Sequence, residues 1–139
     1  NRVFEDYKTI EGSAWSYKNQ PTFLIDIDDT TVGYNLYFNI RNNGNYAYSN
    51  LWVRMHIEEP AKKERVERFE FTLAEPDGRW LGTGIGDIYS NQILLQENVR
   101  FQRKGIYKIK WEQNMRDEPL NGIEDIGMRV EKYTKTHKE

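Results

Sequence analysis

The 139-residue sequence contains no cysteine, which excludes a disulfide framework and a cysteine nucleophile. It has two histidines, and without cysteine these provide too few soft ligands for a zinc site. No apolar run is long enough to cross a bilayer as a helix. Lys and Arg total 20 against 22 Asp and Glu, a net charge of -2, so charge gives no reason to expect nucleic acid or an anionic membrane surface as a partner.

Aromatic residues are abundant, at 14% of the chain. They provide enough bulk to fill the interior of one domain without help from metals or cross-links. We therefore expect residues 1–132 to form a single domain and residues 133–139 to form a flexible C-terminal tail.

The clearest pattern is the alternation of apolar and polar side chains. In residues 34–41 and 51–58 every second residue is apolar, which is typical of a half-buried strand and not of a helix. The polar, glycine-containing stretch 42–50 between them predicts a looped antiparallel hairpin with the two strands side by side. Further strands are predicted at residues 3–7, 23–27, 69–73, 93–101, 107–111 and 126–130.

About eight short alternating strands, with no convincing long amphipathic helix, predict an all-β fold. Each strand has one apolar and one polar face, so two antiparallel sheets packed face to face bury the apolar faces most economically. We expect a two-sheet antiparallel β-sandwich, jelly-roll or immunoglobulin-like.

The glycine-rich run 76–89 invites comparison with nucleotide-binding loops. Its spacing, G-x-G-x-G at residues 82–86, matches neither the dinucleotide fingerprint nor a P-loop. We expect a shaped, turn-rich loop, fixed by Trp80 acting as a plug in the core; a ligand platform at Trp80 is the alternative.

Acidic residues offer few specific signals. Asp26, Asp28 and Asp29 cluster at a predicted strand end, where carboxylate oxygens could hold calcium, but the EF-hand spacing is absent and a simple acidic turn is the main interpretation. The many other carboxylates cannot be placed as a catalytic pair from the sequence. We expect no enzyme activity, no catalytic residues and no cofactor.

The outward positions of the predicted hairpin form the candidate binding surface. Aromatic rings, amides and Arg on a sheet face suit a protein strand or a sugar, although cross-strand stabilisation explains such residues equally well. The candidate binding residues are Tyr37, Asn39, Trp52, Arg54 and His56.

Several segments, in order, resemble the gliding-motility lipoprotein family GldH of Bacteroidetes. The resemblance covers most of the chain. It depends on the combination of these motifs in order, since no single motif would be specific enough. The segments are Tyr34–Asn42, Tyr48–Leu51, Pro76–Asn91, Glu97–Phe101 and Gly122–Lys132.

The resemblance implies a lipid-anchored protein of the cell envelope, facing the periplasm or the cell exterior. Its acylated cysteine would precede Asn1, so the N-terminal lipid anchor is absent from this chain. The implied role is an accessory or assembly component of gliding motility and its secretion machinery, with other envelope proteins as partners. The alternative is a carbohydrate-binding module of a surface or periplasmic lipoprotein, with a glycan as ligand.

Overall fold

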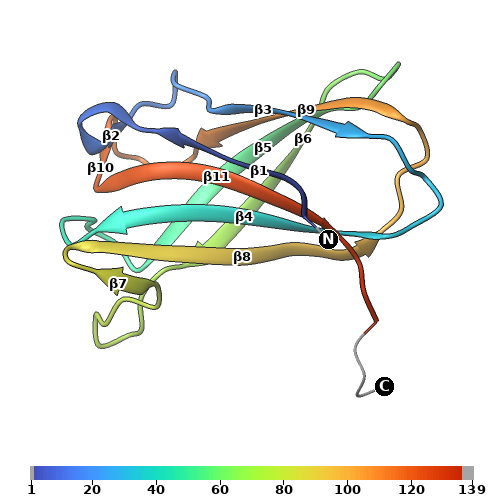
Figure 1. Ribbon diagram of the computed structural model, residues 1–139. Helices are drawn as coiled ribbons and strands as arrows, with labels where there is room; N and C mark the ends of the chain where they lie inside the picture. Colours follow the sequence, from blue (N-terminus) through green and yellow to red (C-terminus); the bar gives the residue numbers. More distant parts are fainter. Residues whose placement is uncertain (1, 136–139) are drawn as a thin grey trace.

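The computed structural model describes residues 2–135, which form an all-β fold of antiparallel sheets packed against one another (Figure 1). This confirms the predicted sandwich. The choice between jelly-roll and immunoglobulin-like topology stays a prediction.

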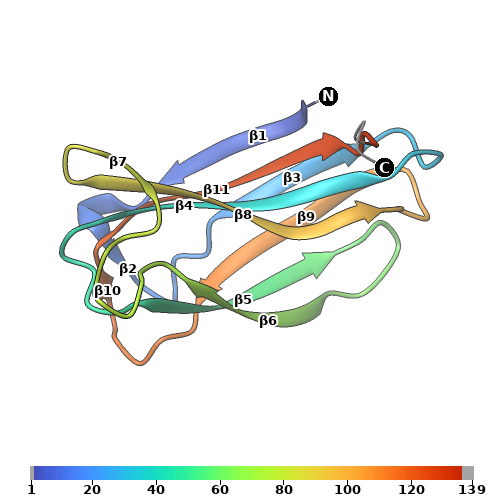
Figure 2. The ribbon, with the colours of Figure 1, turned by 90° about the horizontal axis from the view of Figure 1, so that it is seen from below.

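Within the described residues the larger sheet has five strands in the order β1-β11-β4-β8-β7 and the smaller has four in the order β3-β9-β5-β6. The larger sheet consists of β1 (Arg2–Thr9), β11 (Ile123–Lys132), β4 (Tyr34–Asn43), β8 (Ile88–Val99) and β7 (Thr83–Ile85). The smaller consists of β3 (Thr22–Ile27), β9 (Gly105–Gln113), β5 (Asn50–Glu58) and β6 (Arg65–Thr72). A short pair, β2 (Ala14–Trp15) and β10 (Leu120–Asn121), lies at one end beside the 3-10 turn η1 (Glu11–Ser13) (Figure 2).

The core lies between the two sheets and is rich in aromatic rings. Phe38 of β4 stacks on Phe71 of β6 at 4.8 Å between ring centres, and packs at a tilt against Trp111 of β9 at 4.4 Å. All three rings are buried, so the contact joins the middle of the larger sheet to two strands of the smaller one. The predicted inward faces of residues 34–41 and 51–58 supply much of this core, as the alternation indicated.

The predicted hairpin between residues 34–41 and 51–58 is wrong. Both strands exist, but β4 pairs with β11 and β8 in the larger sheet, whereas β5 pairs with β6 and β9 in the smaller. The chain between Asn43 and Asn50 therefore crosses from one sheet to the other, and does not turn back beside β4.

Tyr46 explains why this connection crosses. Its side chain is 4% exposed, and its hydroxyl donates to the carbonyl of Asn50 at 2.6 Å. Its backbone lies so close to Gly122 that a Cβ atom there would stand 2.6 Å from Tyr46 Cα. The connection is thus packed into the end of the sandwich, and the six residues between the strands are long enough to span the ~10 Å that separates stacked sheets.

The glycine-rich run forms more regular structure than the predicted loop. Its second half is a hairpin in which β7 pairs with the start of β8 across a two-residue turn, Gly86-Asp87. Gly86 has φ 62°, the left-handed value that the first turn position requires of a tight hairpin. Trp80 packs against the core between Tyr46 and Tyr89, which agrees with its expected role as a plug.

The expected tail from residue 133 lies partly outside the described residues, since these end at Lys135. The backbone N–H of Tyr133 donates to the carbonyl of Gly33 at 2.9 Å, so hydrogen bonding to the domain continues to that residue. None of the helical structure between residues 2 and 135 is long and apolar enough to cross a membrane.

Candidate functional site

The five candidate binding residues do not form one surface. Because β4 and β5 belong to different sheets, Tyr37 and Asn39 lie on the outer side of the larger sheet, and Trp52, Arg54 and His56 lie on the outer side of the smaller. The two groups therefore occupy opposite faces of the sandwich, and each must be considered as a separate candidate site.

On the smaller sheet, Arg68 covers the ring of Trp52, a contact that sequence patterns could not predict. The guanidinium carbon of Arg68, on β6, lies 3.8 Å from the centre of the Trp52 ring, and Arg68 Nε donates to Asn114 Oδ1 at 2.8 Å. Such a stacked cation is attracted by the ring quadrupole. Exposed Arg54 lies between Arg68 and Glu112 in the strand register and completes the patch.

His56 sits between two carboxylates on the same face. Its Nε2 lies 2.8 Å from Glu112 Oε1, and its Nδ1 lies 3.3 Å from Glu64 Oε1. Lys110 Nζ lies 3.2 Å from Glu64 Oε2. Lys110 first, and then His56, lower the pKa of Glu64 below its ordinary value. The prediction that His56 faces outward is confirmed; its acidic partners come from β9 and the β5–β6 loop, which sequence spacing could not reveal.

On the larger sheet, Tyr37 lies among charged residues from neighbouring strands. Its register partners are Arg129 on β11 and Leu94 on β8. Arg129 makes ion pairs with Glu131 at 2.9 Å and with Glu5 at 3.2 Å, and these carboxylates raise its pKa. Tyr37 is half-buried among these groups.

Asn39 was expected to face solvent, and this is wrong: the residue is 0% exposed. Its register partner on β11 is Gly127, and the ring of Tyr7 occupies the space that a side chain at Gly127 would need. Neither side-chain atom of Asn39 has a hydrogen-bond partner among the described residues. A buried amide without partners costs about 1–3 kcal/mol, so Asn39 is an unusual choice for this position.

The acidic cluster at the end of β3 is used in a local turn. Asp29 Oδ1 accepts hydrogen bonds from the backbone N–H of Thr31 at 2.9 Å and from its hydroxyl at 2.6 Å, which lowers the pKa of Asp29. Asp26 and Asp28 are exposed. Between residues 2 and 135, no group of three or more His, Asp or Glu side chains is placed to hold a metal ion.

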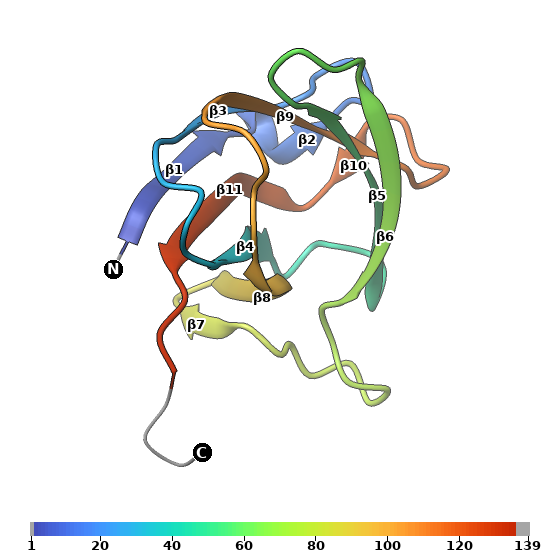
Figure 3. The same cartoon turned by 90° about the vertical axis from the view of Figure 1, so that its right-hand side faces the viewer.

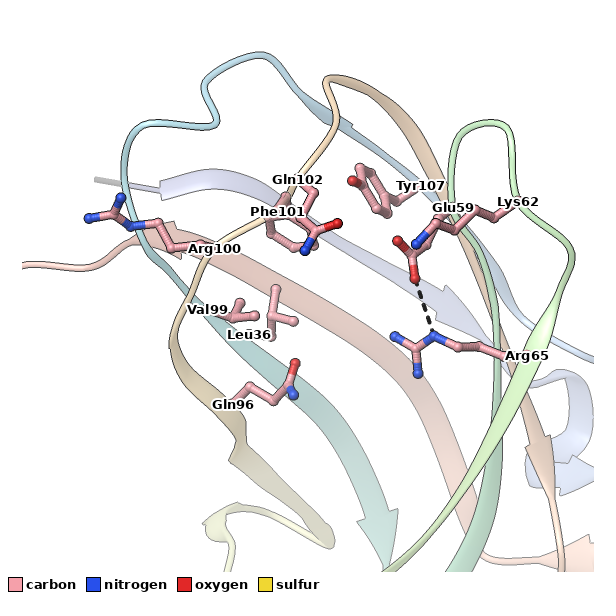
Figure 4. A pocket seen from close by; sticks show the side chains of 10 residues that line it. All are labelled: Leu36, Glu59, Lys62, Arg65, Gln96, Val99, Arg100, Phe101, Gln102 and Tyr107. Atoms are coloured by element: carbon pink, nitrogen blue, oxygen red, sulfur yellow. Dashed lines mark hydrogen bonds and ion pairs between the residues drawn. The ribbon is translucent and has the colours of Figure 1, made fainter.

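A cavity of about 260 Å³ opens at the end of the sandwich between β8 and β6 (Figure 4). Its apolar lining residues Leu36, Val99 and Phe101 pack against the core. Glu59, the only carboxylate among the described lining residues, accepts a hydrogen bond from Arg65 Nε at 3.2 Å. The remaining lining residues are Lys62, Gln96, Arg100, Gln102 and Tyr107. They come from segments far apart in the chain, and sequence reasoning missed this site.

A second groove, of about 230 Å³, runs beside the crossing connection and the glycine-rich run. Three aromatic residues line it, namely Tyr46, Tyr48 and Trp80. The Tyr48 hydroxyl donates to Asp117 Oδ1 at 2.7 Å, which holds that ring at the edge of the groove.

The fold and the candidate sites together define the class of protein. It is a two-sheet antiparallel β-sandwich, with polar side chains clustered on the outer faces of the sheets and around a cavity at one end. Residues 2–130 match the family described as GldH lipoprotein. The match extends over nearly the whole described chain, so the protein belongs to the GldH lipoprotein family.

Two relatives show how similar the chain is to known members. The gliding motility lipoprotein GldH of Flavobacterium johnsoniae is 39% identical over 137 residues, which cover 94% of this chain and 84% of that protein. The gliding motility lipoprotein GldH homolog of Christiangramia forsetii is 37% identical over 138 residues, with the same coverage of 94% and 84%. As a lipoprotein, this protein is anchored to a membrane of the cell envelope.

Proposed function

We propose that this protein is a non-enzymatic accessory component of gliding motility and its associated secretion machinery, which helps assemble that machinery through protein contacts. The names of the relatives support a role in gliding motility, since both are gliding motility lipoproteins. The partners are other envelope proteins, and the anchor places the domain at the periplasmic or outer surface of a membrane.

The observation that carries the contact role is the patch formed by Trp52, Arg68, Arg54 and His56. Trp and Arg are enriched among the residues that dominate protein interfaces. Here they project from neighbouring strands of one sheet and are held by defined contacts, so little side-chain freedom is lost when a partner binds. Both ring nitrogens of His56 contact carboxylates, and these contacts hold the ring in one orientation on the patch.

Lipid anchoring makes weak contacts effective. A domain confined to a membrane surface meets its membrane-bound partners at a high effective concentration, so affinities that would be negligible in solution can hold an assembly together. A flat patch of a few anchoring residues is therefore sufficient for an accessory role.

The two sheet faces can be tested separately in the native host. We expect Trp52→Ala, on the smaller sheet, to reduce crosslinking to envelope partners and to impair gliding or secretion when it replaces the parent protein. Tyr37→Ala, on the larger sheet, serves as the matched aromatic variant of the opposite face. Normal capture and normal phenotype with both variants would remove both faces from consideration, and deletion of the whole gene without any effect on gliding or secretion would reject the proposed function.

A second candidate function, glycan binding, has one specific observation in its favour. The groove lined by Tyr46, Tyr48 and Trp80 offers aromatic surface of the kind that sugars stack upon. Calorimetric titration of the purified domain with envelope glycans would show saturable binding that Trp80→Ala abolishes. Trp52→Ala is the control, because the Trp52 ring is already covered by Arg68.

A further inference from the structure

Most of β8 lies at a free edge of the larger sheet. β7 pairs with β8 only from Ile88 to Ser90. From Gln92 to Val99 the described residues place no strand on the side of β8 that faces away from β4. Alternate backbone N–H and C=O groups along such an edge have no strand to pair with, which makes it a template for another strand.

The first part of this edge, before the register shifts that lie between Leu94 and Val99, lacks the features that usually prevent pairing. Proteins protect exposed edges with charged side chains, proline or strong bulges. The segment Gln92–Gln96 reads Gln-Ile-Leu-Leu-Gln, without charge or proline, and Leu94 is 47% exposed. Closer to the cavity the edge carries one charge, Glu97, and the strand bulges, with Asn98 at φ 55°. By contrast, two other edge strands carry several charges each, namely Arg2, Glu5, Asp6 and Lys8 on β1, and Arg65, Glu67, Arg68 and Glu70 on β6.

The end of this edge leads into the cavity between the sheets. Seen along the sandwich, β8 and β6 lie on the same side of the molecule (Figure 3). Gln96 and Val99 of β8 line the cavity, and Arg100 follows directly (Figure 4). A segment that paired with β8 would therefore bring one of its ends to the cavity.

The charges around the cavity favour an acidic ligand. Lys62, Arg65 and Arg100 line it, whereas Glu59, the one carboxylate among the described lining residues, is already paired with Arg65. Among the described residues, Lys62 and Arg100 make no ion pair with another side chain and are available to an incoming carboxylate. The apolar floor of Leu36, Val99 and Phe101 can receive a neighbouring apolar side chain.

We propose that β8 accepts an extended segment of a partner protein as an additional antiparallel strand, with acidic side chains of that segment at Lys62 and Arg100. This rests on the proposed function and specifies the partner's chemistry. The C-terminal end of β8 lies at the cavity. A segment added antiparallel to β8 runs in the same direction as β7, so its N-terminal end lies near Lys62 and Arg100. The main-chain bonds supply affinity, and the cavity supplies specificity.

Photo-crosslinking in the native host tests whether the β8 edge contacts a partner and identifies the partner segment that it contacts. A photoreactive amino acid in place of Gln92 is expected to crosslink a partner through a segment that is acidic at one end, identified by sequencing the joined peptide. The matched control carries the same group in place of Leu24, which is 59% exposed on the edge strand β3. Crosslinking no stronger at position 92 than at position 24, or crosslinking only to a second copy of this chain, would overturn the proposal.

A charge placed on the edge should block the added strand. We expect Leu94→Lys to lower the yield of the Gln92 crosslink about tenfold, since burying an unpaired cation against a paired strand is costly, whereas Leu24→Lys leaves it unchanged. Both variants should unfold in urea at the same midpoint as the parent. If Leu94→Lys keeps the full crosslink, strand addition is wrong, while the accessory role is judged independently by the deletion phenotype.

A purified domain and synthetic peptides test the charge preference. The probe is an acetylated peptide of about eight alternating Thr and Val residues with glutamates at its N-terminal end, compared with the same peptide bearing lysines there. We expect amide NMR shifts confined to residues 92–100 and about tenfold tighter binding of the acidic peptide, lost in Arg100→Glu. Equal affinity for both peptides, or shifts centred elsewhere, would contradict the proposal.

Discussion

The ring of Tyr7 on β1 lies directly over Gly127 on β11: a Cβ atom at Gly127 would stand 2.7 Å from Tyr7 Cδ1 and 2.7 Å from the carbonyl oxygen of Asp6. Tyr7 and Gly127 are register partners, so this contact fixes how the edge strand β1 lies against the rest of the larger sheet. On the same face, the guanidinium of Arg41 lies 4.3 Å from the centre of the Tyr7 ring, and the ring is thus held from two sides.

Gly127→Ala should destabilise the domain by about 1–3 kcal/mol, because the added methyl group must displace both an aromatic ring and the backbone of β1. Urea unfolding measures this directly. Gly44→Ala is the matched control: its new Cβ would meet only the carboxylate of Asp87, the end of a flexible side chain that can move aside. Equal losses of stability in the two variants would show that the Tyr7 contact does not constrain β1.

The positions of the main strands were predictable because the evidence for them is local. Alternation over five to ten residues identifies a half-buried strand whatever it pairs with, and residues 34–41 and 107–111 fall within β4 and β9. The short strands β2, β7 and β10 were missed, since two or three residues are too few to show a period.

Strand pairing and surface composition were not predictable for a physical reason. The connection 44–49 suits a hairpin as well as a crossing between sheets, and what decides between them is the packing of Tyr46 against Gly122, far away in the sequence. The same applies to the candidate sites: Arg68 over Trp52, and Glu112 beside His56, depend on the register between strands. The cavity at the end of β8 combines residues from several separate segments, so alternation within any one strand could not indicate it.

Phe38→Ala should cost about 3–5 kcal/mol, since it removes the ring that joins β4 to Phe71 and Trp111 across the core. Domains of this kind are stable by about 5–15 kcal/mol, so the variant should unfold at much lower urea concentration. Leu94→Ala on the surface of β8 is the control and should change stability by less than about 0.5 kcal/mol. A small effect of Phe38→Ala would mean that the sheets are held together elsewhere.

Stability should fall in acid partly through Glu124. Its carboxylate accepts hydrogen bonds from Ser13 Oγ and Asn43 Nδ2, both at 2.6 Å, and these donors, Ser13 first, lower its pKa below the ordinary 4.5. A lowered pKa in the folded state means that the ionised form stabilises the fold above pH 4.5, and that this contribution is lost as pH falls through the lowered value.

We therefore expect Glu124→Gln to be less stable than the parent near neutral pH and to approach it in strong acid, so that its unfolding free energy depends less on pH. Urea titrations at several pH values measure this. Glu97→Gln is the control, since Glu97 makes no hydrogen bond or ion pair within residues 2–135 and its variant should follow the pH dependence of the parent. A pH profile of Glu124→Gln parallel to that of the parent would contradict the assignment.

Asn39 provides the sharpest test of whether a residue is present for the fold or for function. Because its buried amide has no partner, replacement by the similarly shaped Leu should raise stability by about 1–3 kcal/mol. Asn42 lies on the same strand and is equally buried, but its amide donates to the carbonyl of Asn43 and its oxygen accepts from Asn91, so Asn42→Leu should lose stability. A gain for Asn39→Leu together with impaired gliding or secretion would assign Asn39 to function, because stability alone would favour Leu. A loss of stability in both variants would show instead that the Asn39 amide finds a partner, such as a buried water, in the folded protein.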